Sequence, residues 1–450
     1  MYACRPKKSL TIALLVAFIA TTAACDILDD EEVVEQEEDA VAEDEEGDDE
    51  AGDDEESAEE DEEDEDEDEQ EEEVAIELDS SEDLDGCYVL TEDYLESGAT
   101  LEGCLHVTED LVVDVDVDIA PGTTLSFGVG NRLELNGSDG GQPAFTALGT
   151  ADDPITFTTD QDEGYPGAWS GIILRHTASD HHRVEHAVIE YGGQNYRINP
   201  RPNQKGGLVL WGEGQLELSH SAFRHNEHAG LSVYSEDSVL DLSESEFVGQ
   251  EGHPIRVRPN QVPSLGEGLS FEDNAIEAVY VSPDRSRDHR DFTIDGTWPA
   301  LDIPYYGGEM DIEAALTLAP GVAVHMASGA EWTVRDGGSL NAVATEDEPI
   351  VFRGQTPAPG YWNGLHYNAS WSDDNKLHHV ELHHAGNTAS LRANHLTSLD
   401  IDHVLVADAP DDAIIVDTAR SPDHHAQLTG CDNLRFENIG GEELANGACD

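Results

Sequence analysis

The chain has 450 residues with 99 Asp and Glu against 21 Lys and Arg, which gives a formal net charge of −78. A surface this acidic repels nucleic acids and other anionic polymers, so a nucleic-acid partner is excluded. With 38% hydrophobic residues, the chain is still apolar enough and long enough to bury a substantial core.

The first residues have the form of an export signal. A basic stretch at residues 5–8 precedes an apolar run, Leu10–Ala20, that is too short for a stable membrane-spanning helix. The run leads into "TTAAC", which resembles a bacterial lipobox apart from Thr22, where leucine is usual. The resemblance implies that residues 1–24 are a lipoprotein signal peptide and that Cys25 is lipidated. An ordinary signal peptide, with Cys25 incidental, is the alternative.

Lipid on Cys25 would attach the mature chain to a bacterial membrane, in the cell envelope. The outer membrane or the cell surface is the expected location. Asp26 follows the cysteine directly, and in some bacteria an aspartate there retains a lipoprotein at the inner membrane. The inner membrane is therefore the second location that the sequence allows.

An acidic segment follows the cysteine. Residues 26–80 contain 36 Asp or Glu and no Lys or Arg. The few apolar side chains cannot offset the entropy of ordering the backbone, and the like charges repel one another. Residues 25–80 are therefore predicted to be a disordered linker that tethers the rest of the chain. A tail that binds cations or a partner is the alternative.

The remaining cysteines lie in two close pairs at the two ends of residues 81–450. Their spacing predicts the disulfides Cys87–Cys104 and Cys431–Cys449, each closing a short loop that contributes ~3 kcal/mol in the loop-entropy model. Both disulfides need an oxidising compartment, in agreement with export. A four-cysteine zinc site would need CxxC-type spacing, which is absent.

Three similar sequence segments in the middle of the chain recur at a fixed interval. They start at Phe223, Phe247 and Phe271 and read "FRHNEHAGLSV", "FVGQEGHPIRV" and "FEDNAIEAVYV". Each ends in a short apolar strand. Strands are also expected before them, starting at Leu216, Val239 and Val262. A fixed period of this length with strands this short predicts a stacked coil of β-strands, with about 24 residues per rung.

A longer repeat divides the folded region. "IAPGTTLSF", "GTADDPITFTT", "PGAWSGI" and "VEHAVIEYGG" in the first half correspond to "LAPGVAVHM", "ATEDEPIVFRG", "PGYWNGL" and "LHHVELHHAG" in the second. Trp169 and Trp362 occupy equivalent corners of this repeat, and the glycine after each lets backbone approach closely. A structural role is therefore favoured for both tryptophans over a ligand-binding role.

Together, these phrases resemble right-handed parallel β-helix proteins, in particular exported bacterial lipoproteins of that family. The resemblance covers most of residues 105–440. It implies an all-β fold, with a right-handed parallel β-helix over residues 81–450 that has disulfide-bonded ends. The two related halves would span about 105–298 and 299–440. The family includes enzymes, adhesins and proteins of other roles, so the resemblance is specific for fold and not for activity.

Histidines are abundant, with 20 in the chain, all after residue 80. The densest cluster, "LHHVELHHAG", would place His379, Glu381 and His383 outward together if the apolar residues between them face inward. One strand cannot bring all three to one ion, so a transition-metal site needs a ligand from a neighbouring rung, such as His366 or His403. An outward polar strand is the alternative. "RHNEH" and "SDHHRVEH" are weaker candidates of the same kind.

No cofactor is required by these motifs, although divalent cations such as Ca²⁺ could gather on an acidic strand face. "VVDVDVDIAPG" is expected to form one strand with Asp114, Asp116 and Asp118 on a single side. Carboxylates two residues apart on a strand are separated by ~6.8 Å, too far for one tight calcium site. A solvated strand face is the favoured interpretation.

Many enzymes with this fold are polysaccharide lyases or glycoside hydrolases. A hydrolase needs paired carboxylates ~5–9.5 Å apart. The doublets Asp152–Asp153, Asp373–Asp374 and Asp411–Asp412 are expected in turns, without an accompanying Arg or His motif. No nucleophile elbow, P-loop or dinucleotide fingerprint occurs in a fitting context. The missing catalytic set favours a protein that is not an enzyme, without deciding the question.

These observations predict a lipid-anchored cell-envelope protein whose β-helix is a non-enzymatic binding or adhesion scaffold for carbohydrate or a partner protein of the envelope. A polysaccharide lyase or glycoside hydrolase acting on an envelope or extracellular glycan is the alternative. Trp211, Trp298 and Trp371 lie outside the repeated corner motif and are the candidate sugar-binding aromatics, although packing is the simpler role for each. The oligomeric state is left open.

Overall fold

The computed structural model describes residues 86–96, 98–137, 140–175, 181–194, 205–281, 291–394, 396–417 and 425–446. All described residues belong to one compact unit within Glu73–Asp450. The predicted signal peptide, the lipidation site Cys25 and the acidic linker lie outside the described residues.

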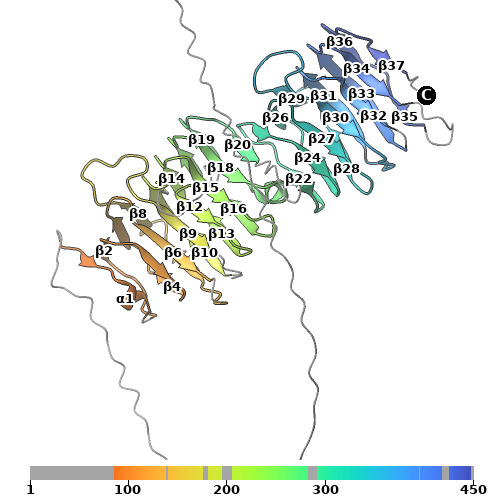
Figure 1. Cartoon of the computed structure of the whole chain (residues 1–450). Helices are drawn as coiled ribbons and strands as arrows, with labels where there is room; N and C mark the ends of the chain where they lie inside the picture. The colour runs from red at the N-terminus through yellow and green to blue at the C-terminus, as the bar shows by residue number, and fades with distance from the viewer. Residues whose placement is uncertain are drawn as a thin grey trace, which may run out of the picture. The chain divides into compact units, whose positions relative to one another are not determined.

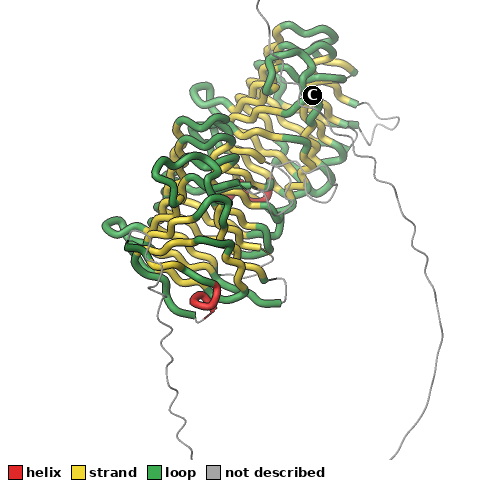
Figure 2. The backbone as a smooth tube through the Cα atoms, turned by 60° about the vertical axis from the view of Figure 1, so that its left-hand side comes forward, coloured by secondary structure: helices red, strands yellow, loops and turns green. Residues whose placement is uncertain are grey.

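The described part of the chain is a coil of short strands, in which each strand pairs with the strand one turn further along (Figure 1). Figure 2 shows the strands stacked side by side, with turns and loops at the corners between them. The pairings are parallel from the first turn, β1 on β2, to the last, β34 on β37. The predicted parallel β-helix is confirmed.

Three faces surround the first half of the coil. Face 1 consists of β4 (Val117–Ile119), β7 (Phe145–Leu148), β10 (His182–Glu185), β13 (Gln215–Ser219) and β16 (Val239–Ser243). Face 2 consists of β1 (Tyr88–Val89), β2 (Cys104–Val107), β5 (Thr124–Phe127), β8 (Ile155–Thr159), β11 (Ala187–Glu190), β14 (Ala222–Arg224), β17 (Glu246–Val248) and β19 (Ser270–Glu272). Face 3 consists of β3 (Leu111–Val113), β6 (Arg132–Asn136), β9 (Gly171–Arg175), β12 (Leu208–Leu210), β15 (Ala229–Val233), β18 (His253–Val257) and β20 (Val279–Val281).

The second half has three faces of the same kind. Face 1′ includes β22 (Gly296–Trp298), β25 (Ala315–Leu318), β28 (Ser339–Val343) and β35 (Gln427–Thr429). Face 2′ includes β23 (Tyr305–Gly307), β26 (Ala323–Met326), β29 (Ile350–Gly354) and β36 (Arg435–Glu437). Face 3′ consists of β21 (Asp291–Phe292), β24 (Met310–Ile312), β27 (Glu331–Val334), β30 (Gly364–Tyr367), β32 (Ala389–Ala393), β34 (Asp412–Val416) and β37 (Leu444–Ala445). Two long strands, β31 (Lys376–His383) and β33 (Ser398–Ala407), bend at a corner and contribute to both face 1′ and face 2′.

Helix is scarce in the described ranges, which contain the five-residue α1 (Glu92–Glu96) and the 3-10 helix η3 (Pro259–Ser264). α1 lies at the N-terminal end of the coil and buries Leu95 (Figure 1). A membrane-crossing helix, which would have to be long and apolar, is not found in the part of the chain that the structure describes.

Alternating side chains build the core of the coil. In β8, the alternate residues Ile155 and Phe157 are fully buried. Phe223, Phe247 and Phe271 pair in register on successive rungs, with ring centroids 4.9 and 5.8 Å apart. The predicted apolar column and its constant interval are confirmed there.

This constant interval does not hold along the whole coil. Leu125 pairs with Leu105 on the preceding rung and with Phe157 on the following one, so the second of these rungs is much longer than the first. The corner loops absorb the difference, because a surface loop lengthens at little cost in free energy while the buried side chains hold the strand register.

A ladder of buried amides runs beside the phenylalanine column. The backbone N–H of Asn226 donates to Gln250 Oε1 at 3.0 Å, and the backbone N–H of Gln250 donates to Asn274 Oδ1 at 3.1 Å. The side-chain amides donate in turn to main-chain carbonyls, Asn226 to Ile189 and Asn274 to Phe247, both at 3.0 Å. The ladder therefore satisfies the backbone N–H groups of Asn226 and Gln250 at a corner beyond the ends of the strands.

The repeated tryptophan motif forms the same corner in both halves. Trp169 and Trp362 are fully buried, so the packing role predicted for both is confirmed. Gly171 and Gly364, two residues further on, have φ values of 98° and 99°. A Cβ on either glycine would lie 2.5 Å from a carbonyl oxygen of the next rung. Glycine is required at both positions for the conformation and for the close approach.

One predicted strand is wrong. The segment from Val262 onward forms η3 in place of a strand, and face 1 ends at β16. Pro259 and Pro263 lie in η3 and lack the backbone N–H that a central strand donates to its neighbour. The 3-10 helix still keeps Val262 in the core.

The two halves join with a shift of one face. β20 of face 3 pairs with β23 of face 2′, which places Tyr280 opposite Tyr306. Faces 2 and 2′ correspond in sequence, because β5 and β26 each follow an "APG" turn. The second half is therefore rotated by one face about the coil axis, and face 3 continues directly into face 2′.

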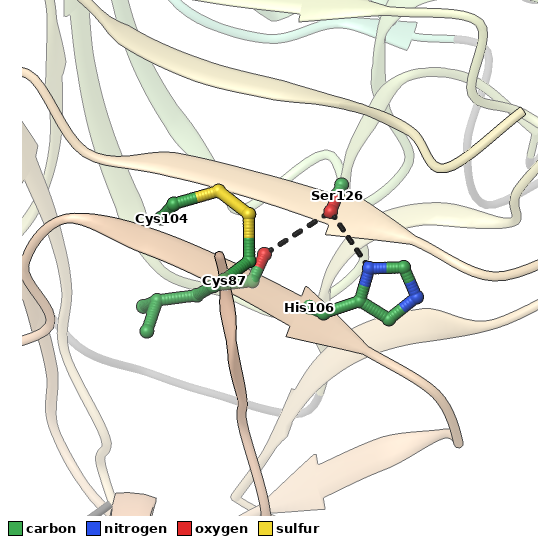
Figure 3. The surroundings of a disulfide bond; sticks show 5 residues. Cys87, Cys104, His106 and Ser126 are labelled. Carbon is green, nitrogen blue, oxygen red and sulfur yellow. Dashed lines mark hydrogen bonds between the residues drawn. A yellow bond between two sulfur atoms is a disulfide. The ribbon is translucent and has the colours of Figure 1, made fainter. Parts of the chain in front are cut away.

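The predicted N-terminal disulfide is confirmed. Cys87 is bonded to Cys104, the first residue of β2 (Figure 3). Beside it, Ser126 Oγ hydrogen-bonds to His106 Nδ1 at 3.1 Å and donates to the carbonyl of Leu105 at 3.2 Å. The disulfide and these hydrogen bonds fasten the first turn of the coil to the next.

The C-terminal disulfide is described at one of its predicted ends. Cys431 is disulfide-bonded. Cys449, the predicted partner, lies outside the described residues, so the pairing of the two stays a prediction.

Candidate functional site

An outward column of basic and aromatic side chains runs along the face that crosses the junction. Its members occupy consecutive strands in register and are each at least partly exposed: Arg256, Tyr280, Tyr306, His325, Arg353 and His383. Because stacked strands are ~4.8 Å apart, the column extends for ~24 Å. We call these six residues the basic–aromatic column.

Neighbouring side chains of the column contact one another. The guanidinium carbon of Arg256 lies 4.2 Å from the ring centroid of Tyr280. The rings of Tyr280 and Tyr306 are stacked, with centroids 5.5 Å apart and 23° between their planes. Further along, Arg353 Nε donates to His325 Nε2 at 2.7 Å. These contacts hold the polar ends of the side chains in a fixed row.

Two titratable groups of the column are held in their neutral forms. Burial, followed by the charge of Arg353, lowers the pKa of His325 to about 4. Burial, followed by Tyr280 and Tyr361, raises the pKa of Tyr306 above its usual value. At neutral pH the uncharged imidazole of His325 and the phenol of Tyr306 therefore lie between Arg256 and Arg353, and both can form hydrogen bonds.

The column differs in charge from the rest of the coil. From residue 81 onward the chain carries 63 acidic and 18 basic side chains. The column itself contains two arginines and no carboxylate. It is therefore a strip on which a ligand rich in oxygen atoms can approach an otherwise repelling surface.

Sequence reasoning missed this column. The spacing between consecutive members varies along the chain, and the shift at the junction brings face 3 onto face 2′, so no single period connects them. One signal was available in the strands "IRV", "VYV" and "AVHM", where a polar or aromatic residue lies between two apolar ones. Such a residue points outward from a buried strand.

The three candidate sugar-binding tryptophans lie in different environments. Trp298 is fully buried, with its ring 5.2 Å from that of Trp332, so it is a core residue and its prediction as a ligand platform is wrong. Trp211 is half-buried and lies under the guanidinium of Arg175, 5.1 Å from its ring centroid. Trp371 is 45% exposed and keeps an accessible ring.

Histidines concentrate at the corner between faces 1 and 2. His186, His220 and Glu244 lie there on successive rungs with φ values of 48°, 50° and 46°. Positive φ is uncommon for residues with a Cβ, and histidine is among the residues that tolerate it best. The single left-handed residue turns the chain sharply from one face to the next.

The second half repeats this corner between faces 1′ and 2′. His379, His403 and Asn433 have φ values of 54°, 50° and 69°. Ring centroids lie 4.9 Å apart for His186 and His220, and 4.4 Å apart for His379 and His403. Each half therefore carries a pair of adjacent imidazoles at an equivalent place.

A groove opens beside each corner. Groove 1, of about 400 Å³, has among its lining residues Pro154, His186, His220, Glu244 and Glu246. Groove 2, of about 190 Å³, has among its lining residues the equivalent Pro349, His379, His403, Asn433 and Arg435. Because the second half is rotated by one face, the two grooves open on different sides of the coil.

The residues of the predicted metal site are only partly brought together. Glu381 Oε2 and His383 Nε2 lie 2.9 Å apart, while His379 lies at the corner against His403. The left-handed backbone at His379 interrupts the alternation expected along the strand. Within the described ranges the three do not form a group whose ligand atoms all lie within 4.8 Å of one another.

His366, one of the two further ligands considered, belongs to another face. It lies on β30 of face 3′, where its Nδ1 is 3.3 Å from Glu331 Oε1 and its Nε2 is 2.7 Å from Asn394 Nδ2. Among the described residues, one group of His, Cys, Asp or Glu has ligand atoms that all lie within 4.8 Å of one another: Glu185, His186 and His220. The weaker motif "SDHHRVEH" supplies two of these and the next rung supplies the third.

The aspartates of "VVDVDVDIAPG" do not share one strand, contrary to expectation. The chain bends at Asp114, so that β3 and β4 belong to different faces. Asp116 Oδ1 accepts a hydrogen bond from the backbone N–H of Ala144 at 2.8 Å, which gives it a structural role. Asp118 lies on β4 and is exposed. The acidic row considered for Ca²⁺ is therefore not formed.

Two of the three acidic doublets lie in bends or turns, as expected: Asp152–Asp153 and Asp373–Asp374. The third differs, because Asp412 is the first residue of β34. Asp412 Oδ1 accepts a hydrogen bond from the backbone N–H of Glu442 at 2.7 Å. These contacts are structural and do not indicate a catalytic pair.

No protein-family model matches the chain, and no curated protein is similar to it.

Proposed function

We propose that this protein binds carbohydrate without turnover, as a lipid-anchored scaffold of the bacterial cell envelope. The basic–aromatic column is the observation that carries the proposal. It presents arginine, tyrosine and histidine side chains on consecutive rungs of a strongly acidic protein. Sugars offer many closely spaced hydroxyl and ring oxygens, which suit the donors of these residues.

The geometry of the column suits an extended ligand. Its members repeat every ~4.8 Å along a face of paired strands, and their mutual contacts limit side-chain freedom before binding. A preordered row loses little conformational entropy when a chain-like ligand lies along it. This supports a polysaccharide strand over a small molecule, which needs an enclosing pocket.

A role without turnover fits the composition of the column. Glycoside hydrolysis needs two carboxylates on either side of the scissile bond. The column has none, and the adjacent carboxylate of Glu381 is paired with His383 at 2.9 Å. These features favour binding over the lyase or hydrolase alternative.

The location is proposed from the sequence. A lipidated Cys25 and the acidic residues 25–80 would hold the coil at a distance from the membrane, with its faces accessible to envelope or external glycans. The outer membrane or the cell surface is the proposed site.

The test is a glycan array with the full mature chain, containing neutral and acidic glycans, followed by calorimetry on a glycan that binds. Tyr280→Ala and Tyr306→Ala should each weaken binding at least tenfold. Trp371→Ala, which removes an exposed ring away from the column, is the matched control and should leave the affinity unchanged. A loss of binding confined to Trp371→Ala would contradict the column as the site.

Turnover is tested on the same glycans. Release of reducing ends or of unsaturated products by the wild-type chain would replace the binding scaffold with the enzyme alternative. Absence of binding to every glycan, together with capture of an envelope protein that depends on Tyr280 and Tyr306, would make a partner protein the ligand in its place.

A further inference from the structure

We infer that groove 1 contains a binding site for a divalent transition-metal ion, formed by Glu185, His186 and His220. One ligand atom from each of the three lies within 4.8 Å of the other two. Glu185 Oε1 is 3.9 Å from His186 Nε2. The inference is independent of carbohydrate binding, because the basic–aromatic column lies on another face.

The ligand atoms of the three residues are somewhat further apart than they would be around a bound ion. With metal–nitrogen and metal–oxygen bonds of ~2.1 Å, neighbouring ligand atoms of a tetrahedral ion are ~3.4 Å apart. The present separations, which are at most 4.8 Å, therefore need a contraction of up to ~1.4 Å to reach that geometry. Side-chain rotation suffices for this, because His186 and Glu185 are 25% and 41% exposed and His220 is exposed.

The backbone holds His186 and His220 next to each other on adjacent rungs. Both occupy the left-handed corner position, and they lie on adjacent rungs, since Glu185 pairs with Ser219 and Val188 pairs with Ala222. Parallel strand pairing on both sides of the corner prevents the rungs from sliding. The imidazoles remain neighbours without a ligand, which lowers the entropy lost on binding an ion.

The surroundings of the site favour a cation. Glu244, on the rung after His220, and Glu246 line the same groove and add negative charge. Arg224 also lines the groove, but it faces Glu246, with Arg224 Nη2 and Glu246 Oε2 3.5 Å apart. Two imidazoles and a carboxylate prefer Zn²⁺, Cu²⁺ or Ni²⁺ over Ca²⁺ and Mg²⁺.

Groove 2 provides an internal comparison. Its histidines, His379 and His403, are stacked nearly parallel, with 19° between their planes, and His403 Nδ1 lies 2.9 Å from Asp402 Oδ2. The position of Glu185 is taken by His378, whose Nε2 is 3.0 Å from Asp400 Oδ2. The same corner is therefore present in groove 2 without the three converging ligand atoms.

The test is titration of the full mature chain with ZnCl₂, monitored by calorimetry in millimolar Mg²⁺, which is added to compete for non-specific binding to the carboxylates of residues 26–80. One equivalent of Zn²⁺ should bind. His186→Asn and His220→Asn should each weaken binding at least tenfold. Asparagine tolerates the left-handed conformation and already occupies the equivalent corner at Asn433, so the fold is expected to persist.

The matched control is His379→Asn together with His403→Asn, the same change at groove 2, which should leave the affinity unchanged. Glu185→Gln should weaken binding less than either histidine change. With Co²⁺ as the probe, d–d absorption should appear in the wild type and disappear in His186→Asn. Equal Zn²⁺ affinity of the wild type and both groove 1 variants would overturn the inference, as would a loss seen only in the groove 2 control.

Discussion

Trp169 Nε1 donates a hydrogen bond to the carbonyl oxygen of Glu190 at 2.8 Å, and this bond has a counterpart in the other half of the coil. Trp362 Nε1 donates to the carbonyl of His383, also at 2.8 Å. The tryptophan and its acceptor have the same separation along the chain in both cases. The two copies of the motif therefore form the same packed corner, and the hydrogen bond of the indole N–H is present in both.

Removing this indole donor should destabilise the coil. Trp169→Phe keeps a buried ring but leaves the Glu190 carbonyl without its partner and opens a small cavity. We expect a loss of ~2 kcal/mol in the free energy of unfolding, measured by urea denaturation. Trp371→Phe, at an exposed ring, should change it by less than ~0.5 kcal/mol. Equal effects of the two substitutions would contradict the corner role.

Gly171→Ala should be far more damaging than alanine at an unobstructed glycine. At Gly171, a Cβ would lie 2.5 Å from the carbonyl oxygen of Gly206, and φ is 98°. Gly329 also has positive φ, 68°, but no heavy atom within 4 Å of the added Cβ. The cost at Gly329 should be ~1 kcal/mol of backbone strain, and at Gly171 at least ~2 kcal/mol more. Urea denaturation of both variants measures the difference, which would be near zero if conformation alone mattered.

The buried amide ladder should depend on each member. Asn226→Ala removes the acceptor for the backbone N–H of Gly192 at 2.8 Å and the donor to the carbonyl of Ile189. Since the Gly192 N–H would stay buried without this partner, while the Ile189 carbonyl keeps its place in the pairing of β11 with β14, we expect a loss of ~2 kcal/mol in the free energy of unfolding. Asn363→Ala is the control, because its side chain makes an exposed hydrogen bond to Gly329. A cost for Asn226→Ala below ~1 kcal/mol would show that the ladder is dispensable.

Acid should destabilise the coil through His182. Its ring is fully buried, its Nδ1 accepts a hydrogen bond from the backbone N–H of Phe145 at 3.2 Å, and burial, followed by His181, lowers its pKa to about 4. An unfolded histidine has a pKa of ~6.5, so between these values the unfolded chain binds the extra proton. Stability should therefore fall as the pH is lowered from ~6.5 to ~4, by up to ~1.4 kcal/mol per pH unit from this group.

His182→Asn isolates that contribution. The asparagine Oδ1 can accept the hydrogen bond of Phe145 but does not titrate in this range. Urea denaturation at pH 7 and pH 5 should show a smaller loss for the variant than for the wild type. Identical losses would mean that other buried groups, such as His253 with a pKa of about 4, account for the acid sensitivity.

The proposed lipid anchor predicts a change of location. Cys25→Ser should remove the acylated residue and release the chain from the membrane fraction of expressing cells. Labelling with a fatty-acid analogue, followed by fractionation, measures both effects. A chain that stays unlabelled and soluble with Cys25 intact would contradict the anchor.

The parallel β-helix could be predicted from local patterns. Buried residues alternate with polar ones within strands of three to five residues, and Phe223, Phe247 and Phe271 recur at a constant interval because each must enter the same column. The corner glycines and tryptophans could be predicted because their motif recurs in both halves of the sequence, although their contacts lie on other rungs, Trp169 with Glu190 and Gly171 with Gly206. The Cys87–Cys104 disulfide likewise follows from short spacing.

The two proposed binding surfaces were decided by tertiary structure alone. The basic–aromatic column depends on the shift that brings β20 onto β23 and so joins face 3 to face 2′. His186 and His220 meet across a rung that is longer than the regular repeat, because a corner loop sets its length. Lengthening a loop costs little free energy, so loop lengths vary from rung to rung. The alternation within a strand therefore predicts which side chains face outward, but it does not predict which of them become neighbours on adjacent rungs.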